Sequence, residues 1–363
     1  MQFDPKPATA RLARRLALPA TACALLVHGA TAAPKQPQEL IFYPPPPDEP
    51  RIQFLTAFSA ESELAKRSRL SEFIVGDQQY QRPIWKPYGI TTTPGKLYIC
   101  DTLPKNLCIV DLAKRRFSYF KPEGQGVFKM PINVAVDAEG YRYITDTVRG
   151  QLLIYDKNGK FIEALGKAPD TKPCGVAVAG DRLYVTDMTN QCVRIYNRRT
   201  RELLLTLPRD RSNPQSRLFQ PTNVALDPDG RIYVSDTTGF AVHLFDAEGN
   251  HLRAIGEMGL TPGRFALPKG IAPDRQGRFY VVDAATGVVQ LFDREGRLLM
   301  YFGETQSGGA GALVLPAGIA VDYDNVKYFQ QHVAPNRKIE YLIYVTNQAG
   351  PRRVSVYGFL QTP

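Results

Sequence analysis

Residues 97–102 read LYICDT, and close variants of this hexapeptide recur along the chain. They are RYITDT at 142–147, LYVTDM at 183–188, IYVSDT at 232–237, FYVVDA at 279–284 and IYVTNQ at 343–348. Each variant follows a Pro-x-(Gly/Asn)-(Ile/Val) start, and the six starting prolines are separated by 44, 42, 48, 47 and 48 residues. The chain therefore contains one unit that is repeated six times.

Most units contain four short runs of alternating apolar residues, separated by turns with glycine such as DPDGR at 227–231. Four strands in 40–50 residues are typical of a propeller blade, which needs neighbours to bury both of its faces. The sequence predicts an all-β, six-bladed β-propeller of four-stranded blades. The sixth unit lacks a fourth strand, so we expect RIQFLTAF at 51–58 to supply it and close the ring.

The first 32 residues are predicted to be an export signal. They contain three arginines, a short apolar stretch at 16–27 and small residues before a cut after Ala32. A lipoprotein cut before Cys23 is the weaker alternative. We therefore expect a periplasmic or secreted protein, without a transmembrane span in the mature chain and monomeric.

The mature chain divides into two predicted parts. Residues 33–50 form a Pro-rich lead segment, in which PPPPDEP at 44–50 favours polyproline II. Residues 51–363 form the propeller.

The repeated motifs resemble those of the NHL-repeat family of six-bladed propellers. The resemblance lies in the P-x-G-I-A-V-D start, the (I/L)-Y-V-x-D-T strand end and the following (V/R)-x-(L/I)-(F/Y)-D strand, over about residues 51–363. The resemblance implies the propeller fold. The family contains binding platforms, RNA readers and a few enzymes, so the fold does not select a function. Export argues against nucleic acid as the partner.

One acidic or amide residue ends the second strand of every unit. A carboxylate at a strand end can accept hydrogen bonds from backbone N–H groups and fix a loop, so we expect a structural role for the whole set. We expect no catalytic residue and no metal ligand among them. The set is Asp101, Asp146, Asp187, Asp236, Asp283 and Asn347.

The strand starts are predicted to surround a central channel. Four units have Gly at the third position, whereas Asn133 and Asn223 replace it in the other two. Together with Tyr88 and Lys269, these residues are the candidates for binding a small ligand at the channel mouth. No Glu stands there, although by resemblance the propeller lactonases need a Glu/Asn/Asp metal cluster.

We therefore expect no cofactor and no catalysis. One alternative is a lactonase-like hydrolase or lyase with a metal, such as calcium, in the channel. A second alternative is a small-ligand sensor at the channel mouth. Cys100 and Cys108 flank a predicted turn, and in an oxidising compartment they are candidates for a disulfide, with buried free thiols as the alternative. Trp85, the single Trp, is expected to pack in the core or between blades.

The formal charge is +10, of which +3 belongs to the first 33 residues. Antiparallel strands place the first-to-second and third-to-fourth turns at one end of each blade, here called the hairpin face. The second-to-third turns and the connections between blades lie at the other end, the loop face. Twelve basic residues are assigned to the loop face: Lys105, Lys129, Arg149, Lys167, Lys172, Arg209, Arg211, Arg217, Arg264, Lys269, Arg352 and Arg353.

Five acidic residues oppose them: Glu123, Asp170, Asp210, Glu257 and Glu304. A basic face attracts acidic partners, whereas an ordinary solvated surface is the alternative. The preferred interpretation is an exported, non-catalytic scaffold that binds an acidic protein, an anionic polymer or a membrane surface. An insertion at 323–342 lengthens the sixth unit on the hairpin face and is a candidate second contact surface.

Overall fold

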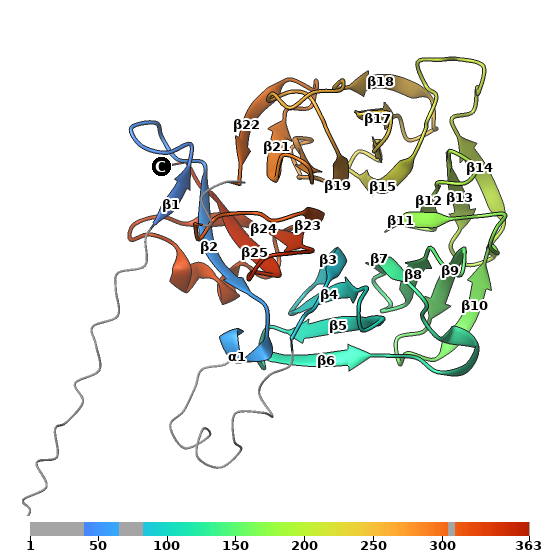
Figure 1. The fold of residues 1–363 in the computed structure, drawn as a ribbon, viewed down its shortest axis with the longest axis horizontal. Coiled ribbons are helices and arrows are strands. Elements are labelled where there is room, and N and C mark those ends of the chain that lie inside the picture. Colours follow the sequence, from blue (N-terminus) through green and yellow to red (C-terminus); the bar gives the residue numbers. More distant parts are fainter. Residues whose placement is uncertain (1–39, 65–82, 304–308, 363) are drawn as a thin grey trace, which may run out of the picture. The chain divides into compact units, whose positions relative to one another are not determined.

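A computed structural model describes residues 40–64, 83–303 and 309–362, which belong to one compact unit. These residues form six antiparallel sheets arranged around a centre (Figure 1). The innermost strand of each sheet contacts that of the next, and the sixth contacts the first. The predicted all-β, six-bladed propeller is confirmed. The predicted export signal lies outside the described residues.

Each blade runs from an inner to an outer strand. Blade 1 contains β3 (Pro87–Thr93), β4 (Lys96–Asp101), β5 (Asn106–Asp111) and β6 (Arg116–Phe120). Blade 2 contains β7 (Pro131–Val136), β8 (Arg142–Asp146), β9 (Gln151–Tyr155) and β10 (Phe161–Leu165). Blade 3 contains β11 (Pro173–Ala179), β12 (Arg182–Asp187), β13 (Cys192–Asn197) and β14 (Leu203–Leu207).

The remaining blades follow the same order. Blade 4 contains β15 (Pro221–Leu226), β16 (Ile232–Asp236), β17 (Ala241–Phe245) and β18 (His251–Ile255). Blade 5 contains β19 (Pro268–Pro273), β20 (Phe279–Asp283), β21 (Val288–Phe292) and β22 (Leu298–Phe302). Blade 6 contains β23 (Pro316–Asp322), β24 (Ile339–Asn347), β25 (Val354–Leu360), β2 (Ile52–Phe58) and β1 (Ile41–Tyr43).

The N-terminal strand closes the ring as predicted. β2 pairs with β25 from Ile52 opposite Phe359 to Phe58 opposite Val354. β1 adds a fifth strand that the sequence did not predict, because it has only three residues. Residues 44–50 reverse the chain between these antiparallel strands, so the prediction of polyproline II for this segment is wrong.

Every inner strand begins at a proline. Proline lacks a donor N–H, and it is tolerated here because the innermost strand is an edge of its sheet. The strand register shifts directly after each of these prolines. At the third position the blades approach closely: a Cβ on Gly175 would lie 2.6 Å from the Cα of Asn223, and one on Gly270 would lie 2.6 Å from the carbonyl oxygen of Ala317. Glycine is required at these two points.

Apolar clusters fill the spaces between blades. The cluster that joins blades 6 and 1 includes Leu55 and Phe58 of β2. The insertion in blade 6 contains the short 3-10 helices η3 (Val326–Tyr328) and η4 (Gln330–His332). Its Asn325 donates to the carbonyl of Thr93 at 3.0 Å and accepts the N–H of Gly95 at 2.6 Å, so the insertion ties blade 6 to blade 1.

The only α-helix among the described residues, α1 (Glu61–Leu64), follows β2, and a further 3-10 helix, η2 (Gly124–Gly126), follows β6. No described helix has the length and hydropathy needed to cross a membrane.

The expected disulfide between Cys100 and Cys108 does not form. Cys100 pairs with Leu107 and Cys108 with Ile99, so the two cysteines are one residue out of register. Successive residues of a strand point to opposite faces of the sheet, and the two thiols accordingly belong to different apolar clusters. All four cysteines of the described residues are free and buried.

Candidate functional site

The strand-end carboxylates hold the loops of the loop face. Asp101 accepts the backbone N–H groups of Trp85 at 2.7 Å and of Lys86 at 2.8 Å. Burial raises the pKa of Asp101, and these hydrogen bonds oppose that shift. The same arrangement occurs at Asp146, Asp187, Asp236 and Asp283, and Asn347 accepts the N–H of Val314. These acceptors are therefore occupied by backbone donors.

Several basic side chains bond to carbonyl groups on the loop face. Arg149 donates to the carbonyls of Gln125 and Val127 at 2.8 and 2.7 Å. Arg211 donates to the carbonyl of Asn190 at 3.3 Å. Arg352 donates to a carbonyl in the connection between blades 5 and 6, and Arg353 to one in its own turn. A carbonyl does not neutralise an arginine, so these positive charges remain available.

Ion pairs are scarce among the predicted loop-face cations. Of the twelve, Arg264 alone forms an ion pair with a described residue, namely Glu257 at 2.8 Å. That pair is more than half exposed and contributes little to stability. Five of the others are exposed to solvent and have neither an ion pair nor a side-chain hydrogen bond with a described residue: Lys105, Lys129, Lys167, Lys172 and Arg217.

The hairpin face has the opposite arrangement. Arg198 is buried and bonds to both Asp137 and Glu139, which lie on the neighbouring blade. The hydrogen bond with Glu139 is the main cause of the raised pKa of Arg198. Further pairs join Arg278 to Asp274, Arg297 to Asp293 and Arg294 to Asp229. Acidic turn residues thus neutralise these four arginines of the hairpin face.

The structure moves one predicted residue off the loop face. Arg209 reaches the carbonyl of Glu248, which lies in the turn between β17 and β18. That turn belongs to the hairpin face, and the outer strand of blade 3 approaches it through Leu205 and Leu207, which would touch a Cβ on Gly249. Arg209 thus lies at the rim between blades 3 and 4, because the outer strand twists away from the direction of the inner one.

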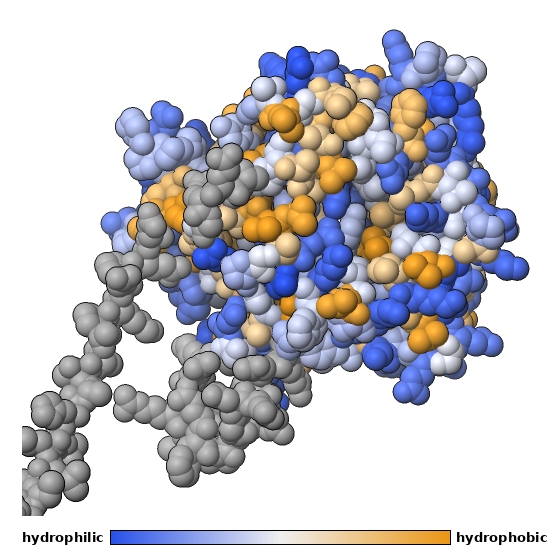
Figure 2. Space-filling model, in the orientation of Figure 1, coloured by the Kyte–Doolittle hydropathy of each residue, from blue (hydrophilic) through white to orange (hydrophobic). Residues whose placement is uncertain are grey.

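Exposed apolar side chains lie among the loop-face cations. Trp85 is 51% exposed, so the expectation that it packs in the core or between blades is wrong. The guanidinium of Arg217 lies over the ring of Phe219, at 5.1 Å from its centre. The other large exposed apolar residues of this face are Leu103, Val127, Val148, Met258, Leu260, Val314 and Leu315. Figure 2 shows such mixing of hydrophobic and hydrophilic residues on the face in view.

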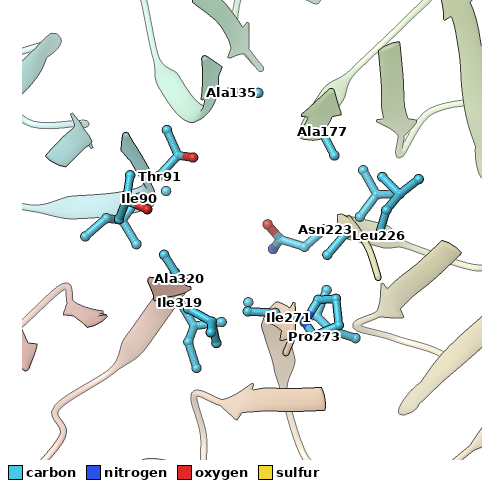
Figure 3. Close-up of a pocket in the computed structure, with 18 of the residues that line it drawn as sticks. Ile90, Thr91, Ala135, Ala177, Asn223, Leu226, Ile271, Pro273, Ile319 and Ala320 are labelled. Carbon is cyan, nitrogen blue, oxygen red and sulfur yellow. The ribbon is translucent and has the colours of Figure 1, made fainter. Parts of the chain in front are cut away.

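A cavity of about 480 Å³ occupies the channel, with walls made by all six inner strands (Figure 3). Most wall residues are aliphatic, among them Ile90, Ile271 and Ile319. Asn133 and Asn223 line its end nearest the loop face, where the amide of Asn133 donates to the side-chain oxygen of Asn223 at 2.6 Å. The Nδ2 group of Asn223 has no partner among the described residues.

The other two predicted channel residues lie together, one position nearer the loop face. The ammonium of Lys269 lies 5.4 Å from the centre of the Tyr88 ring. Burial lowers the pKa of Lys269, and the positive charge of Lys86 lowers it further. The four candidates therefore form two pairs. Sequence reasoning missed Lys86, although it directly precedes a strand-opening proline, as Lys172 does in blade 3.

Two histidines meet in blade 4, which the sequence did not predict. Nδ1 of His243 lies 3.2 Å from Nε2 of His251, across β17 and β18. Burial lowers the pKa of His243 to about 4, so it is neutral at pH 7. Within the described residues, no three His, Cys, Asp or Glu side chains gather as metal ligands would.

Comparisons with known proteins show the fold alone. No family model and no curated protein matches the sequence. A protein of unknown function from Bacteroides thetaiotaomicron is similar, with 17% identity, a TM-score of 0.60, and coverage of 85% of this chain and 76% of that one. A streptogramin B lyase is similar at 16% identity, with a TM-score of 0.51 and coverage of 77% and 84%.

A catalytically inactive virginiamycin B lyase from Staphylococcus aureus, solved with quinupristin, is similar at 13% identity. Its TM-score is 0.52, and the match covers 76% of this chain and 95% of that one. Identities this low carry no activity over to this chain.

Proposed function

We propose that this propeller is a non-catalytic scaffold whose loop face binds an acidic protein. The observation that carries the proposal is that the loop-face cations lack ion pairs with described residues, apart from Arg264. Unpaired surface cations create a positive potential that steers and orients an acidic partner. On the hairpin face, Arg198, Arg278 and Arg297 do not add to a positive potential, because carboxylates neutralise them.

The apolar residues of the same face favour a protein over a free polymer. Interfaces between proteins are enriched in Trp, other aromatic residues and Arg. Trp85 and the stacked pair Arg217–Phe219 supply these residue types on the loop face. A basic face can also bind an anionic membrane surface. The test below distinguishes this partner from an acidic protein.

The test uses Trp85 as its reporter, because it is the single tryptophan and lies exposed on the loop face. Poly-L-glutamate is titrated into the full-length protein while tryptophan fluorescence is recorded. Reversal of Lys172, Arg211 and Arg217 to Glu is expected to weaken binding by about tenfold or more, since each lost contact contributes about 0.5–1 kcal/mol. Vesicles of anionic lipid form a parallel arm.

The matched control reverses three exposed lysines of the hairpin face, Lys96, Lys157 and Lys160, to Glu. It makes the same change in net charge, so binding should persist if the location of the charge matters. Equal weakening by both triple reversals would overturn the proposal. Response to vesicles but not to poly-L-glutamate would replace the acidic protein with a membrane.

We also propose that the protein is exported and that its blades are of the NHL type. The arginines and apolar stretch of residues 1–32 support export, and the repeated strand-opening Pro and strand-end Asp support the blade type. N-terminal sequencing of the protein from a cell-envelope fraction tests the export proposal. A start after Ala32 is expected, and an intact Met1 would contradict it.

A further inference from the structure

Three lysines stand around the loop-face mouth of the channel. Lys86 precedes the strand-opening proline of blade 1, Lys172 precedes that of blade 3, and Lys269 follows that of blade 5. Blades 1, 3 and 5 alternate around a ring of six, and their inner strands converge on the channel. The three residues, here called the mouth lysines, therefore stand at alternate positions around one opening.

The mouth lysines have no counter-charge in the described residues. None forms an ion pair or a side-chain hydrogen bond with a described residue, and the ring of Tyr88 gives Lys269 only a cation–π contact. The nearest carboxylates are occupied: Asp101 accepts the backbone N–H of Lys86, and Asp187 accepts that of Lys172. Lys86 and Lys172 are exposed, whereas Lys269 is half-buried, and a partly buried ammonium without an anion is costly.

Electrostatics supports this placement. Lys86 lowers the pKa of Lys269 through like-charge repulsion, after the larger effect of burial. Burial raises the pKa of the Cys174 thiol to about 12, and Lys269 and Lys172 both oppose that shift. Lys86 thus lies close enough to Lys269, and Lys172 and Lys269 lie close enough to Cys174, for their charges to interact. An anion bound beside Lys269 would offset both the repulsion from Lys86 and the cost of burying the Lys269 ammonium.

The floor of the mouth limits how deep a ligand can enter. The amide pair Asn133–Asn223 crosses the channel at the next strand position, and the aliphatic cavity begins there. A charged group that went deeper would lie among Ile90, Ile271 and Ile319, whose side chains offer it neither a hydrogen bond nor an opposite charge. We therefore expect the charged end of a ligand to stay at the mouth.

We propose that the mouth lysines Lys86, Lys172 and Lys269 form a binding site for carboxylate groups, either on the acidic partner or on a free polycarboxylate. The first source rests on the proposed function, whereas the second does not. Three cations around one opening favour a ligand with several carboxylates over one with a single carboxylate.

Calorimetric titration with citrate, and with acetate for comparison, tests the site. Replacement of Lys269 by Met is expected to weaken citrate binding by about tenfold, whereas Lys269→Arg retains it. The control is Lys160→Met, which removes an exposed lysine from the hairpin face. Citrate should raise the pKa of Lys269 in a direct NMR titration, because the anion stabilises the ammonium.

Equal citrate affinity in wild type and K269M, or equal loss in K160M, would overturn the site. A poly-L-glutamate titration of K269M separates the two sources of carboxylate. Weakening in both titrations assigns the site to the acidic partner. Weakening with citrate alone assigns the site to a free polycarboxylate. The proposed function is then tested separately, by reversal of Arg211 and Arg217 to Glu in the poly-L-glutamate titration.

Discussion

The hairpin face and the loop face both contain arginines and carboxylates, but they combine them differently. On the hairpin face, Asp137 and Glu139 of blade 2 bond to Arg198 of blade 3. On the loop face, Asp236 bonds instead to the backbone N–H groups of Phe219 and Gln220. Asp137 and Glu139 thus join two blades and neutralise an arginine, whereas the strand-end carboxylates of the loop face mainly hold backbone N–H groups, and Asp187 alone among them pairs with a described arginine, Arg194. One face serves stability and the other is available to a partner.

The largest expected effect comes from removing a loop-face anchor. Asp236→Ala leaves the partly buried N–H groups of Phe219, Gln220 and Gly239 without their acceptor. Since an unsatisfied buried donor costs about 1–3 kcal/mol and these three are only partly buried, we expect a loss of about 3 kcal/mol in the free energy of unfolding. Urea denaturation measures it. The variant Asp236→Asn should lose less stability, because Asn347 fills the equivalent place in blade 6. A loss below about 1 kcal/mol for the alanine variant would contradict the anchor role of Asp236.

The next effect separates the arginines of the two faces. Arg198→Met should cost about 3 kcal/mol, because it leaves the buried carboxylate of Asp137 without its partner. Arg217→Met should change the free energy of unfolding by about 0.5 kcal/mol or less, because Arg217 is exposed and unpaired among the described residues. Equal costs for the two substitutions in urea denaturation would remove the contrast between the faces.

The pH dependence of stability should have opposite signs at the two faces. The hydrogen bond from Arg198 lowers the pKa of Glu139, so Glu139 stabilises the fold above its ordinary pKa of 4.5 and loses this effect as pH falls through the lowered value. Burial raises the pKa of Asp236, so its effect is present at low pH and is lost as pH rises through the raised value.

Unfolding measured between pH 3 and pH 7 can separate these terms. The variant Glu139→Gln should lose less stability on acidification than the wild type does. The variant Asp236→Asn should lose less on the return to neutral pH. If the unfolding free energy of either variant depends on pH more steeply than that of the wild type, the pKa of the replaced carboxyl group is not shifted in the predicted direction.

The sequence predicted what depends on local pattern. Repeated turn glycines and strand alternation mark each blade, and the missing fourth strand of the sixth unit predicted that Ile52–Phe58 would close the ring. It could not predict features set by register or twist. A difference of one residue in the register of β4 and β5 places Cys100 and Cys108 on opposite faces of their sheet. The twist of the outer strand places Arg209 at the rim between blades 3 and 4. Trp85 was misplaced because a large apolar residue in a connection can remain exposed.

A smaller effect distinguishes the faces by salt. Raising the salt concentration from 0.05 to 0.5 M shortens the screening length from roughly 14 Å to roughly 4 Å. Binding of poly-L-glutamate to the loop face should weaken severalfold, because Lys172 and Arg217 are exposed to solvent. The free energy of unfolding should change less, since the pairs of Arg198 are buried. Binding that is insensitive to salt would indicate that the apolar residues dominate the interface.

The most direct test of the loop face as the binding surface is hydrogen exchange of the full chain with and without poly-L-glutamate. We predict slower exchange in the loop-face segments 188–191 and 210–220 and unchanged exchange in the hairpin turns 227–231 and 293–297. Protection confined to the hairpin turns would contradict the account, because the partner would then bind the face on which Arg198, Arg278 and Arg297 are already neutralised.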